Sequence, residues 1–162
     1  MTLPIFTSEN FRQVLGSFPT GVTIVTVKDG KEKRGITVNS FCSVSLNPPL
    51  ILICIGKEHK THELIKDSRV FAVNILREDQ KELSERFSRV NRPKERFKGL
   101  STWVAVTGSP ILEGCLAFID CKVVSEYPGG DHTLFLAQAE AIGSAEDHGK
   151  ALVFYQGKYT SI

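Results

Sequence analysis

Residues 21–40 read GVTIVTVKDGKEKRGITVNS, and no other segment says as much about the architecture of this chain. Residues 21–27 are rich in β-branched side chains, which favour an extended strand. Asp29-Gly30 is a dipeptide typical of a tight hairpin turn. Residues 34–40 then alternate again and predict the return strand. The segment therefore predicts two neighbouring antiparallel strands.

Strands outnumber helices along the rest of the chain. Residues 50–55 are continuously apolar and have the length of a central strand that is buried on both faces. Further strands are predicted at 70–76, 103–106, 115–126, 133–141 and 152–155, and helices at 7–18, 61–67 and 79–87. Since hairpins outnumber crossovers, the pattern predicts an antiparallel barrel with a few peripheral helices. No G-x-G-x-x-G follows a strand and no P-loop sequence occurs, which argues against a Rossmann nucleotide site.

The first helix has clear boundary signals. Thr7 is a favourable N-cap, and Phe6 and Phe11 have the spacing of a hydrophobic staple around it. Pro19 cannot continue the helix and ends it. The helix then carries one apolar face at positions i, i+3, i+4 and i+7, formed by Phe11, Val14, Leu15 and Phe18.

Length and composition restrict the class of protein. The 162 residues predict a single domain, residues 1–162, and a net charge of +2 gives no sign of a nucleic-acid or membrane partner. A basic run at residues 86–98 is interpreted as a solvated loop. No stretch reaches the ~18 apolar residues of a membrane span, and residues 1–10 lack a signal-peptide pattern, so a cytoplasmic location is expected. The cysteines form no C-x-x-C pair and are expected to be buried, reduced thiols: Cys42, Cys54, Cys115 and Cys121.

Short hydrogen-bonding side chains gather after the hairpin. In a strand, Thr37 and Asn39 point to one face, and small hydroxyls follow at Ser40, Ser43 and Ser45. Such groups match the polar edge of a flavin, which carries both acceptors and an N–H. A strand with a solvated polar face and a Pro-Pro turn would have the same composition.

A second candidate site lies at residues 56–62, between the apolar strand and a short helix. Lys60 and the capping hydroxyl of Thr61, together with free backbone N–H groups at the helix start, would bind an anion such as phosphate. An ordinary polar loop before a capped helix would look the same. His59 and His62 lack a third ligand nearby, so no metal site is expected.

A third candidate site is Gly129-Gly130-Asp131-His132, at the start of a predicted strand. Glycines allow the backbone to approach a ligand closely, and an imidazole beside them could contact a nicotinamide. The alternative is a β-turn with an exposed histidine.

The order of these motifs resembles one known family. The chain carries Gly16-Ser17-Phe18-Pro19-Thr20-Gly21, then T-x-N-S-F-x-S-V-S-x-x-P-P from Thr37, and G-D-H at residues 130–132. Over residues 11–159 this is similar to the flavin reductase-like family, and especially to the small reductase components of two-component flavin monooxygenases, such as those that partner 4-hydroxyphenylacetate and phenol hydroxylases.

The resemblance implies a homodimeric FMN-binding split β-barrel with the flavin at the subunit interface. It implies that NADH or NADPH reduces FMN or FAD and that an oxygenase component receives the reduced flavin. His132 would position the nicotinamide. The flavin would contact Pro19, Thr20, Thr37, Asn39, Ser40, Ser43, Val44, Ser45, Lys60 and Thr61, the last two at its phosphate. The chain departs from many members at Leu136-Ala137, where they carry Ile-Gly, and at Lys60, where some carry serine.

Two other functions remain open on the sequence. A flavin-binding electron carrier would need no nicotinamide site, and His132 argues against it. An oxidase of the pyridoxamine phosphate type would need a strongly basic substrate pocket, and no arginine cluster stands near the G-D-H segment. A purely structural module would leave the polar run at residues 37–45 unexplained. The choice between FMN and FAD, and between NADH and NADPH, is not determined by the sequence.

Overall fold

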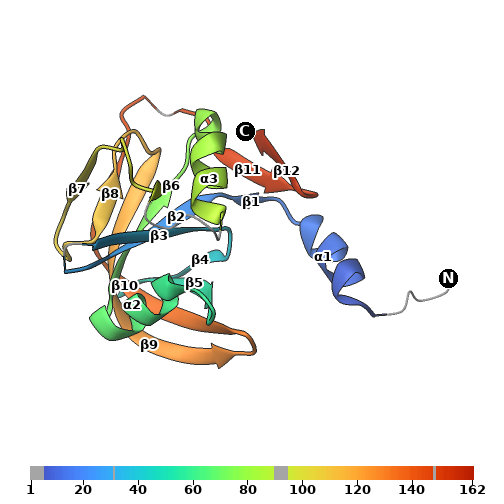
Figure 1. The fold of residues 1–162 in the computed structure, drawn as a ribbon, viewed down its shortest axis with the longest axis horizontal. Coiled ribbons are helices and arrows are strands. Elements are labelled where there is room, and N and C mark those ends of the chain that lie inside the picture. Colours follow the sequence, from blue (N-terminus) through green and yellow to red (C-terminus); the bar gives the residue numbers. More distant parts are fainter. Residues whose placement is uncertain (1–5, 31, 90–94, 148) are drawn as a thin grey trace.

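The computed structural model describes residues 6–30, 32–89, 95–147 and 149–162 (Figure 1). Its helices are α1 (Ser8–Gly16), α2 (Lys60–Ser68), the 3-10 turn η1 (Glu78–Gln80) and α3 (Lys81–Ser88). Its strands are β1 (Thr20–Gly21), β2 (Thr23–Asp29), β3 (Glu32–Val38), β4 (Phe41–Leu46), β5 (Pro49–Gly56), β6 (Val70–Ile75), β7 (Thr102–Val104), β8 (Pro110–Leu112), β9 (Ala117–Gly129), β10 (His132–Ser144), β11 (Leu152–Tyr155) and β12 (Lys158–Ser161).

The hairpin predicted at residues 21–40 is confirmed. β2 and β3 pair antiparallel from Thr23↔Val38 to Asp29↔Glu32. Gly30 occupies the turn with φ +53°, a left-handed conformation that glycine adopts at no steric cost. The predicted return strand ended at residue 40, whereas β3 ends at Val38 and a further strand, β4, begins at Phe41.

The largest sheet is antiparallel, with seven strands in the order β3-β2-β6-β9-β10-β5-β4. β3 and β4 therefore form its opposite edges, although only Asn39 and Ser40 separate them in the chain. Two residues cannot span a flat seven-stranded sheet, because neighbouring strands lie ~4.8 Å apart. The sheet must curl until its edges meet at residues 39–40. No β3–β4 ladder closes the seam among the described residues, so the fold is the split β-barrel that the sequence predicted.

Alternating side chains fill the barrel. Ile51, Ile53 and Ile55 of β5 are at most 7% exposed and belong to one core cluster with Phe135 of β10 and Phe71 of β6. The intervening residues Leu50, Leu52 and Cys54 are only half-buried. β5 is thus paired on both sides, as expected of a central strand, but one of its faces looks out of the barrel.

A second core lies between the sheet and the C-terminal hairpin. It contains Phe87 from α3, Val22 and Leu152, with Phe154 and Tyr159 packed at its border. Figure 1 shows α3 beside this hairpin and across the barrel from α2. Gly35 of β3 lies directly beneath Phe87, since a Cβ at this position would be 2.7 Å from the Phe87 ring.

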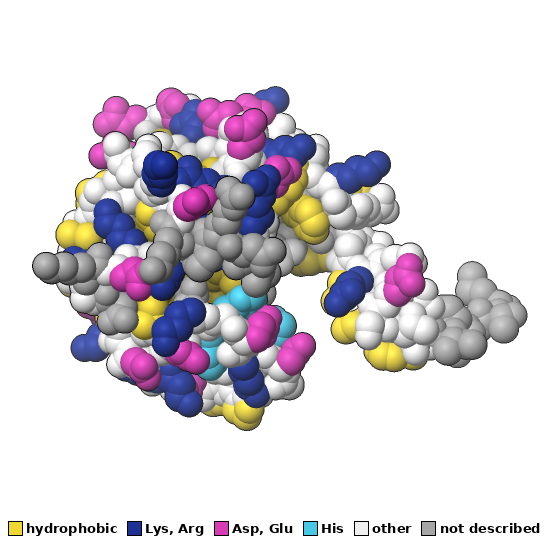
Figure 2. All heavy atoms as spheres, viewed as in Figure 1, with side chains coloured by type: hydrophobic (Ala, Val, Ile, Leu, Met, Phe, Trp, Pro, Cys, Tyr) yellow, Lys and Arg dark blue, Asp and Glu magenta, His cyan; other side chains and the backbone are white. Residues whose placement is uncertain are grey.

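Helix α1 stands away from the barrel (Figure 1). Thr7 is its N-cap and accepts a hydrogen bond from the Asn10 N–H, and the Phe6 and Phe11 rings lie 5.5 Å apart, as the sequence predicted. The apolar face of this helix is nevertheless uncovered: Phe11, Val14, Leu15 and Phe18 are 47%, 69%, 55% and 73% exposed. Figure 2 shows hydrophobic side chains along this projecting helix.

The charged side chains of the remaining surface are mixed in sign on the face seen in Figure 2. The basic run at residues 86–98 is not one loop: residues 86–88 belong to α3, residues 90–94 lie outside the described residues, and Arg96 donates to the Gly35 carbonyl at 2.6 Å. No helix in the described ranges is long and apolar enough to cross a membrane.

The contact beneath Phe87 predicts the outcome of one substitution. Gly35→Ala should lower the free energy of unfolding by about 1–3 kcal/mol, because the added methyl group overpacks the aromatic pair of α3 and the segment after it. Gly21→Ala is the matched control, since a Cβ there meets nothing within 4 Å, and should change stability by less than ~0.5 kcal/mol. Chemical denaturation measures both, and equal effects would contradict the close packing of α3 on β3.

Candidate functional site

A cavity of about 130 Å³ lies between the end of β3 and the β11–β12 hairpin, at the start of the connection to β4. Its lining residues are Val22, Thr37, Asn39, Phe154 and Tyr159. Thr37 and Asn39 were predicted from the polar run, whereas the two aromatic residues come from the far end of the chain. No local pattern indicates them, because tertiary packing of the separate β1-β11-β12 sheet against the barrel brings them beside β3.

Hydrogen bonds fix the walls of this cavity. The Thr37 hydroxyl donates to the Ser84 carbonyl of α3 at 2.6 Å. The Ser84 hydroxyl in turn shares a 2.9 Å hydrogen bond with the Tyr159 hydroxyl of β12. Three separate elements are thereby tied together around one opening. Asn39 is exposed, and no hydrogen bond to its side chain is found in the described part of the chain, so its amide can face a ligand.

Thr20 lies beside the cavity with an unused hydroxyl. It pairs with Phe154 across β1 and β11, which places the two side chains on one face. Its Oγ1 is buried and makes no hydrogen bond within the described part of the chain. A buried hydroxyl without a partner is costly, which is a reason to expect a ligand atom near it. Pro19, the preceding residue, is exposed.

The predicted polar run after Asn39 forms β4 at the edge of the sheet. Ser40 uses its hydroxyl within the fold, donating to the Cys54 carbonyl at 2.7 Å. A register shift between Ser43 and Ser45 leaves Val44 as an extra residue in a β-bulge. Ser43 and Val44 are exposed, and Ser45 is half-buried. As an edge strand with a bulge, β4 presents backbone N–H and C=O groups that the sheet does not use.

The second candidate site differs from its prediction in one respect. Helix α2 begins at Lys60, but its N-cap is His59, and Thr61 is only 4% exposed. Thr61 therefore does not cap the helix with its hydroxyl. Lys60 is exposed at the helix start, where its ammonium lies 2.5 Å from Glu63.

The third candidate site is joined to the second. The Lys57 N–H donates to the Asp131 carbonyl at 3.0 Å, and its ammonium donates to the Gly130 carbonyl at 2.6 Å. His132 pairs with Gly56 at the start of β10. The glycine turn and the loop before α2 therefore form one continuous rim of the barrel.

His132 is accessible at this rim, with 47% of its side chain exposed. Its Nδ1 lies 2.7 Å from the Asp131 carboxylate, and this hydrogen bond holds the pKa of Asp131 below its usual range. His62, in contrast, is buried between α2 and β10, where it bonds the Thr133 hydroxyl at 2.8 Å and burial lowers its pKa. His132 is thus suited to meet a ligand, and His62 to hold the helix.

β5 connects His132 to the polar run. The Cys54 N–H donates to the Ser40 carbonyl, and two residues later Gly56 pairs with His132. Ser40 and His132 therefore lie at the same end of three adjacent strands. Of the predicted residues, the structure groups Thr20, Thr37 and Asn39 around the cavity, and Ser40, Lys60 and His132 along the neighbouring rim.

The outward face of these strands is apolar. We call it the outer strip; its members, related by the strand pairing, are Cys42, Leu52, Cys54, Leu134 and Leu136. All but the exposed Cys42 are half-buried. The sequence predicted buried thiols, but only Cys121 is buried, although all four cysteines are free. Partial burial, and then the neighbouring Cys42, raise the pKa of Cys54, and burial raises that of Cys115 to about 12.

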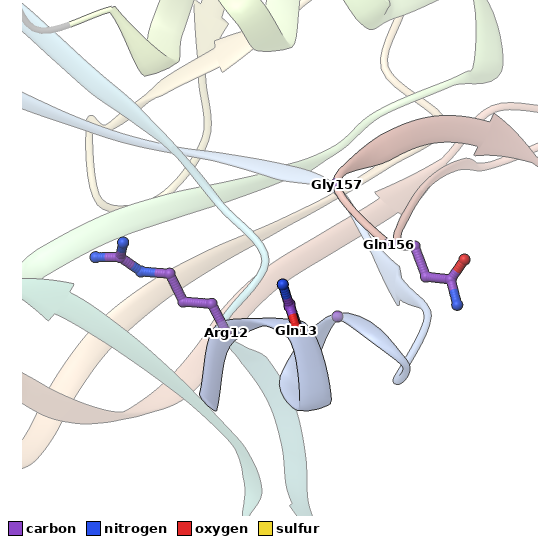
Figure 3. A pocket seen from close by; sticks show the side chains of 5 residues that line it. Arg12, Gln13, Gln156 and Gly157 are labelled. Carbon is purple, nitrogen blue, oxygen red and sulfur yellow. The ribbon is translucent and has the colours of Figure 1, made fainter. Parts of the chain in front are cut away.

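A crevice of about 430 Å³ lies between α1 and the β11–β12 turn, lined by Arg12, Gln13, Gly16, Gln156 and Gly157 (Figure 3). One backbone hydrogen bond crosses it, from the Gln156 N–H to the Gly16 carbonyl at 2.9 Å. In Figure 3 the Gln156 side chain points away from Gln13, so the polar groups do not converge on one point. The crevice marks the place where α1 leaves the barrel.

No group of three or more potential metal ligands occurs in the residues that the structure describes. The polar cavity, the free strand edge and the accessible imidazole instead suit an organic ring with a polar edge.

Comparisons with known proteins agree with this geometry. Residues 15–162 match the family described as the flavin reductase like domain. The chain belongs to this family.

Two curated relatives illustrate the membership. The reductase subunit HsaB of a flavin-dependent monooxygenase from Mycobacterium tuberculosis strain H37Rv is 39% identical over 153 residues, covering 94% of this chain and 81% of the relative. An NADH-dependent FAD reductase from Streptomyces globisporus is 44% identical over 131 residues, covering 78% and 71%. Among solved structures, the NADH:FAD oxidoreductase SgcE6 from Streptomyces globisporus superposes with a TM-score of 0.91 at 34% identity, covering 100% of this chain and 97% of that one.

Proposed function

We propose that this protein is an NAD(P)H-dependent flavin reductase that reduces FMN or FAD and delivers the reduced flavin to an oxygenase component. The observation that carries the proposal is the meeting of the Thr37–Asn39 cavity and the free edge of β4 at the open seam of the barrel. Two of the relatives described above, an NADH-dependent FAD reductase and the reductase subunit of a flavin-dependent monooxygenase, support the same class.

The residues around the seam fit a flavin. Thr20 offers a buried hydroxyl that has no hydrogen-bond partner among the described residues, Asn39 an exposed amide, and β4 the backbone groups of its outer edge. Phe154 and Tyr159 add aromatic surface for a ring. When bound, the flavin accepts a hydride from NAD(P)H, so the chain itself needs no nucleophile or acid.

The contribution of the chain is then positioning and electrostatics. Backbone N–H groups of Ser43, Val44 and Ser45 are proposed to face the polar edge of the ring and to favour the negative charge that grows there on reduction. The hydroxyls of Thr37 and Ser40 donate hydrogen bonds within the fold. We propose that these side chains shape the pocket and that their oxygens accept hydrogen bonds from the ligand. Lys60 and the backbone at Thr61 are proposed to hold a flavin phosphate at the start of α2.

His132 is proposed to orient the nicotinamide. It is exposed, its Nδ1 is fixed by Asp131, and it lies at the same rim as Ser40. An imidazole held in this way fixes the position of the hydride donor without holding the flavin. Such positioning lowers the entropic cost of bringing the two rings together.

We further propose that the protein is a homodimer that works in the cytoplasm. The exposed apolar face of α1 and the half-buried outer strip are two surfaces that one chain leaves uncovered, and a second copy related by twofold symmetry can cover both. A second chain would also close the open side of the flavin pocket. The four free cysteines accord with a reducing compartment.

The direct test of the reaction is an assay of the purified protein with NADH and NADPH and with added FMN, FAD and riboflavin. We expect oxidation of the nicotinamide, followed at its near-ultraviolet absorbance, to depend on added or bound flavin. The preferred pair identifies the coenzymes. Flavin binding without nicotinamide oxidation would instead indicate an electron carrier.

His132→Ala should separate nicotinamide positioning from flavin binding. We expect kcat/KM for NAD(P)H to fall roughly ten- to a hundred-fold, the size of one or two lost positioning contacts, while flavin affinity changes only a few-fold. Steady-state kinetics and a flavin titration measure the two quantities. Normal kinetics would remove His132 from the site, and loss of flavin would place it in the flavin pocket.

The dimer predicts a mass of two chains in light scattering at micromolar concentration. Val14→Glu puts a charge on the uncovered face of α1 and should shift the mass towards one chain, because burying a charge is costly. Gln13→Glu adds the same charge to the neighbouring face of the same helix and serves as the control. A single-chain mass for the unaltered protein would overturn the dimer.

A further inference from the structure

The C-terminal hairpin contributes an aromatic wall to the candidate flavin pocket. Tyr159 on β12 lines the cavity together with Thr37 and Asn39, although 120 residues separate it from Asn39 in the chain. Its side chain is half-buried, so part of the ring is left without a protein contact.

Three contacts hold Tyr159 in place. Its hydroxyl bonds the Ser84 hydroxyl at 2.9 Å, and its ring packs against Phe154 with centroids 5.3 Å apart at 64°. The Lys81 ammonium lies 5.9 Å from the ring centroid, within cation–π range. These contacts restrict the rotamers of Tyr159 in the protein without ligand, so that ordering this side chain adds little to the entropic cost of binding.

The same hydrogen-bond chain reaches a residue of the polar run. Ser84 accepts the Thr37 hydroxyl at its carbonyl and meets Tyr159 at its own hydroxyl. The position of Tyr159 is therefore linked through α3 to β3, the strand that leads into Asn39.

We propose that Tyr159 is a contact residue for the flavin ring, forming the wall on which the isoalloxazine rests. This inference rests on the proposed flavin reductase function and adds a residue that the sequence motifs did not indicate. An aromatic pair in offset or edge contact is favourable beyond its buried area, and an unstrained, pre-positioned ring gives that contact at low entropic cost.

The identity of the ring gives the contact a spectroscopic signature. A phenol is electron-rich and donates an electron to a photoexcited flavin at van der Waals distance, which quenches flavin fluorescence. A phenylalanine ring of the same shape does not. Tyr159→Phe therefore retains the wall but removes the quencher, whereas Tyr159→Ala removes both.

The experiment compares Tyr159→Phe, Tyr159→Ala and the control Tyr155→Phe in the full-length protein. Tyr155 is on the same hairpin but pairs with Lys158, on the opposite face of β11 from Phe154, and is exposed. The fluorescence lifetime of bound FMN or FAD, the flavin Kd and kcat for NADH are measured for each, with thermal melting to check folding.

We expect Tyr159→Phe to lengthen the lifetime of bound flavin several-fold with Kd within about three-fold of the unaltered protein. Tyr159→Ala should raise Kd by about three- to ten-fold. Tyr155→Phe should change neither. An unchanged lifetime in Tyr159→Phe overturns the proposal, and this variant decides the matter if Tyr159→Ala fails to fold. Absence of nicotinamide oxidation by the unaltered protein would contradict the reductase function alone, since the lifetime comparison requires only bound flavin.

Discussion

The connection of two residues, Asn39 and Ser40, between the opposite edges of a seven-stranded sheet is the constraint on which the rest of this structure depends. It forces the sheet to curl, because the chain has no length to cross a flat one. It also leaves the seam open, since β3 and β4 approach at one end without forming a ladder in the described residues. The cavity, the free strand edge and the neighbouring aromatic hairpin all meet at that seam.

The site divides its polar residues between two tasks. Thr37 and Ser40 donate hydrogen bonds to backbone carbonyls of α3 and β5, which fixes the positions of these elements relative to β3 and its connection to β4. Asn39, Ser43 and Val44 are exposed. The proposed flavin pocket would use both kinds: rigid groups that define its shape, and uncommitted groups that match the ligand. His132 is of the second kind: within the described residues its Nδ1 bonds Asp131, and no hydrogen bond to its Nε2 is found there.

Sequence patterns of a few residues predicted those elements that turn residues, capping residues or a run of apolar residues define. The β2–β3 turn at Gly30 and the Thr7 cap were predicted correctly. β5 was correctly predicted as a central strand, but only one of its two faces is buried, where its continuous apolar run predicted both. β4 was not predicted as a strand because its exposed hydroxyl residues have no buried face to produce an apolar period. Thr61 has a cap-like composition, but packing buries it one position inside the helix. Phe154 and Tyr159 enter the pocket only through tertiary closure, which no window of sequence reports. The order of motifs indicated the family before any of these contacts were known.

An unclosed barrel has two sheet edges, and this chain treats them differently. On β3 the Arg96 guanidinium donates a hydrogen bond to the Gly35 carbonyl. The same strand carries the charged residues Glu32, Lys33 and Arg34. Such an edge resists the addition of a strand from another molecule. β4 carries only small hydroxyls, Cys42 and aliphatic residues after Phe41, with no charge at all. Of the two edges, that of β4 is therefore the one at which a strand from another molecule could add by backbone pairing.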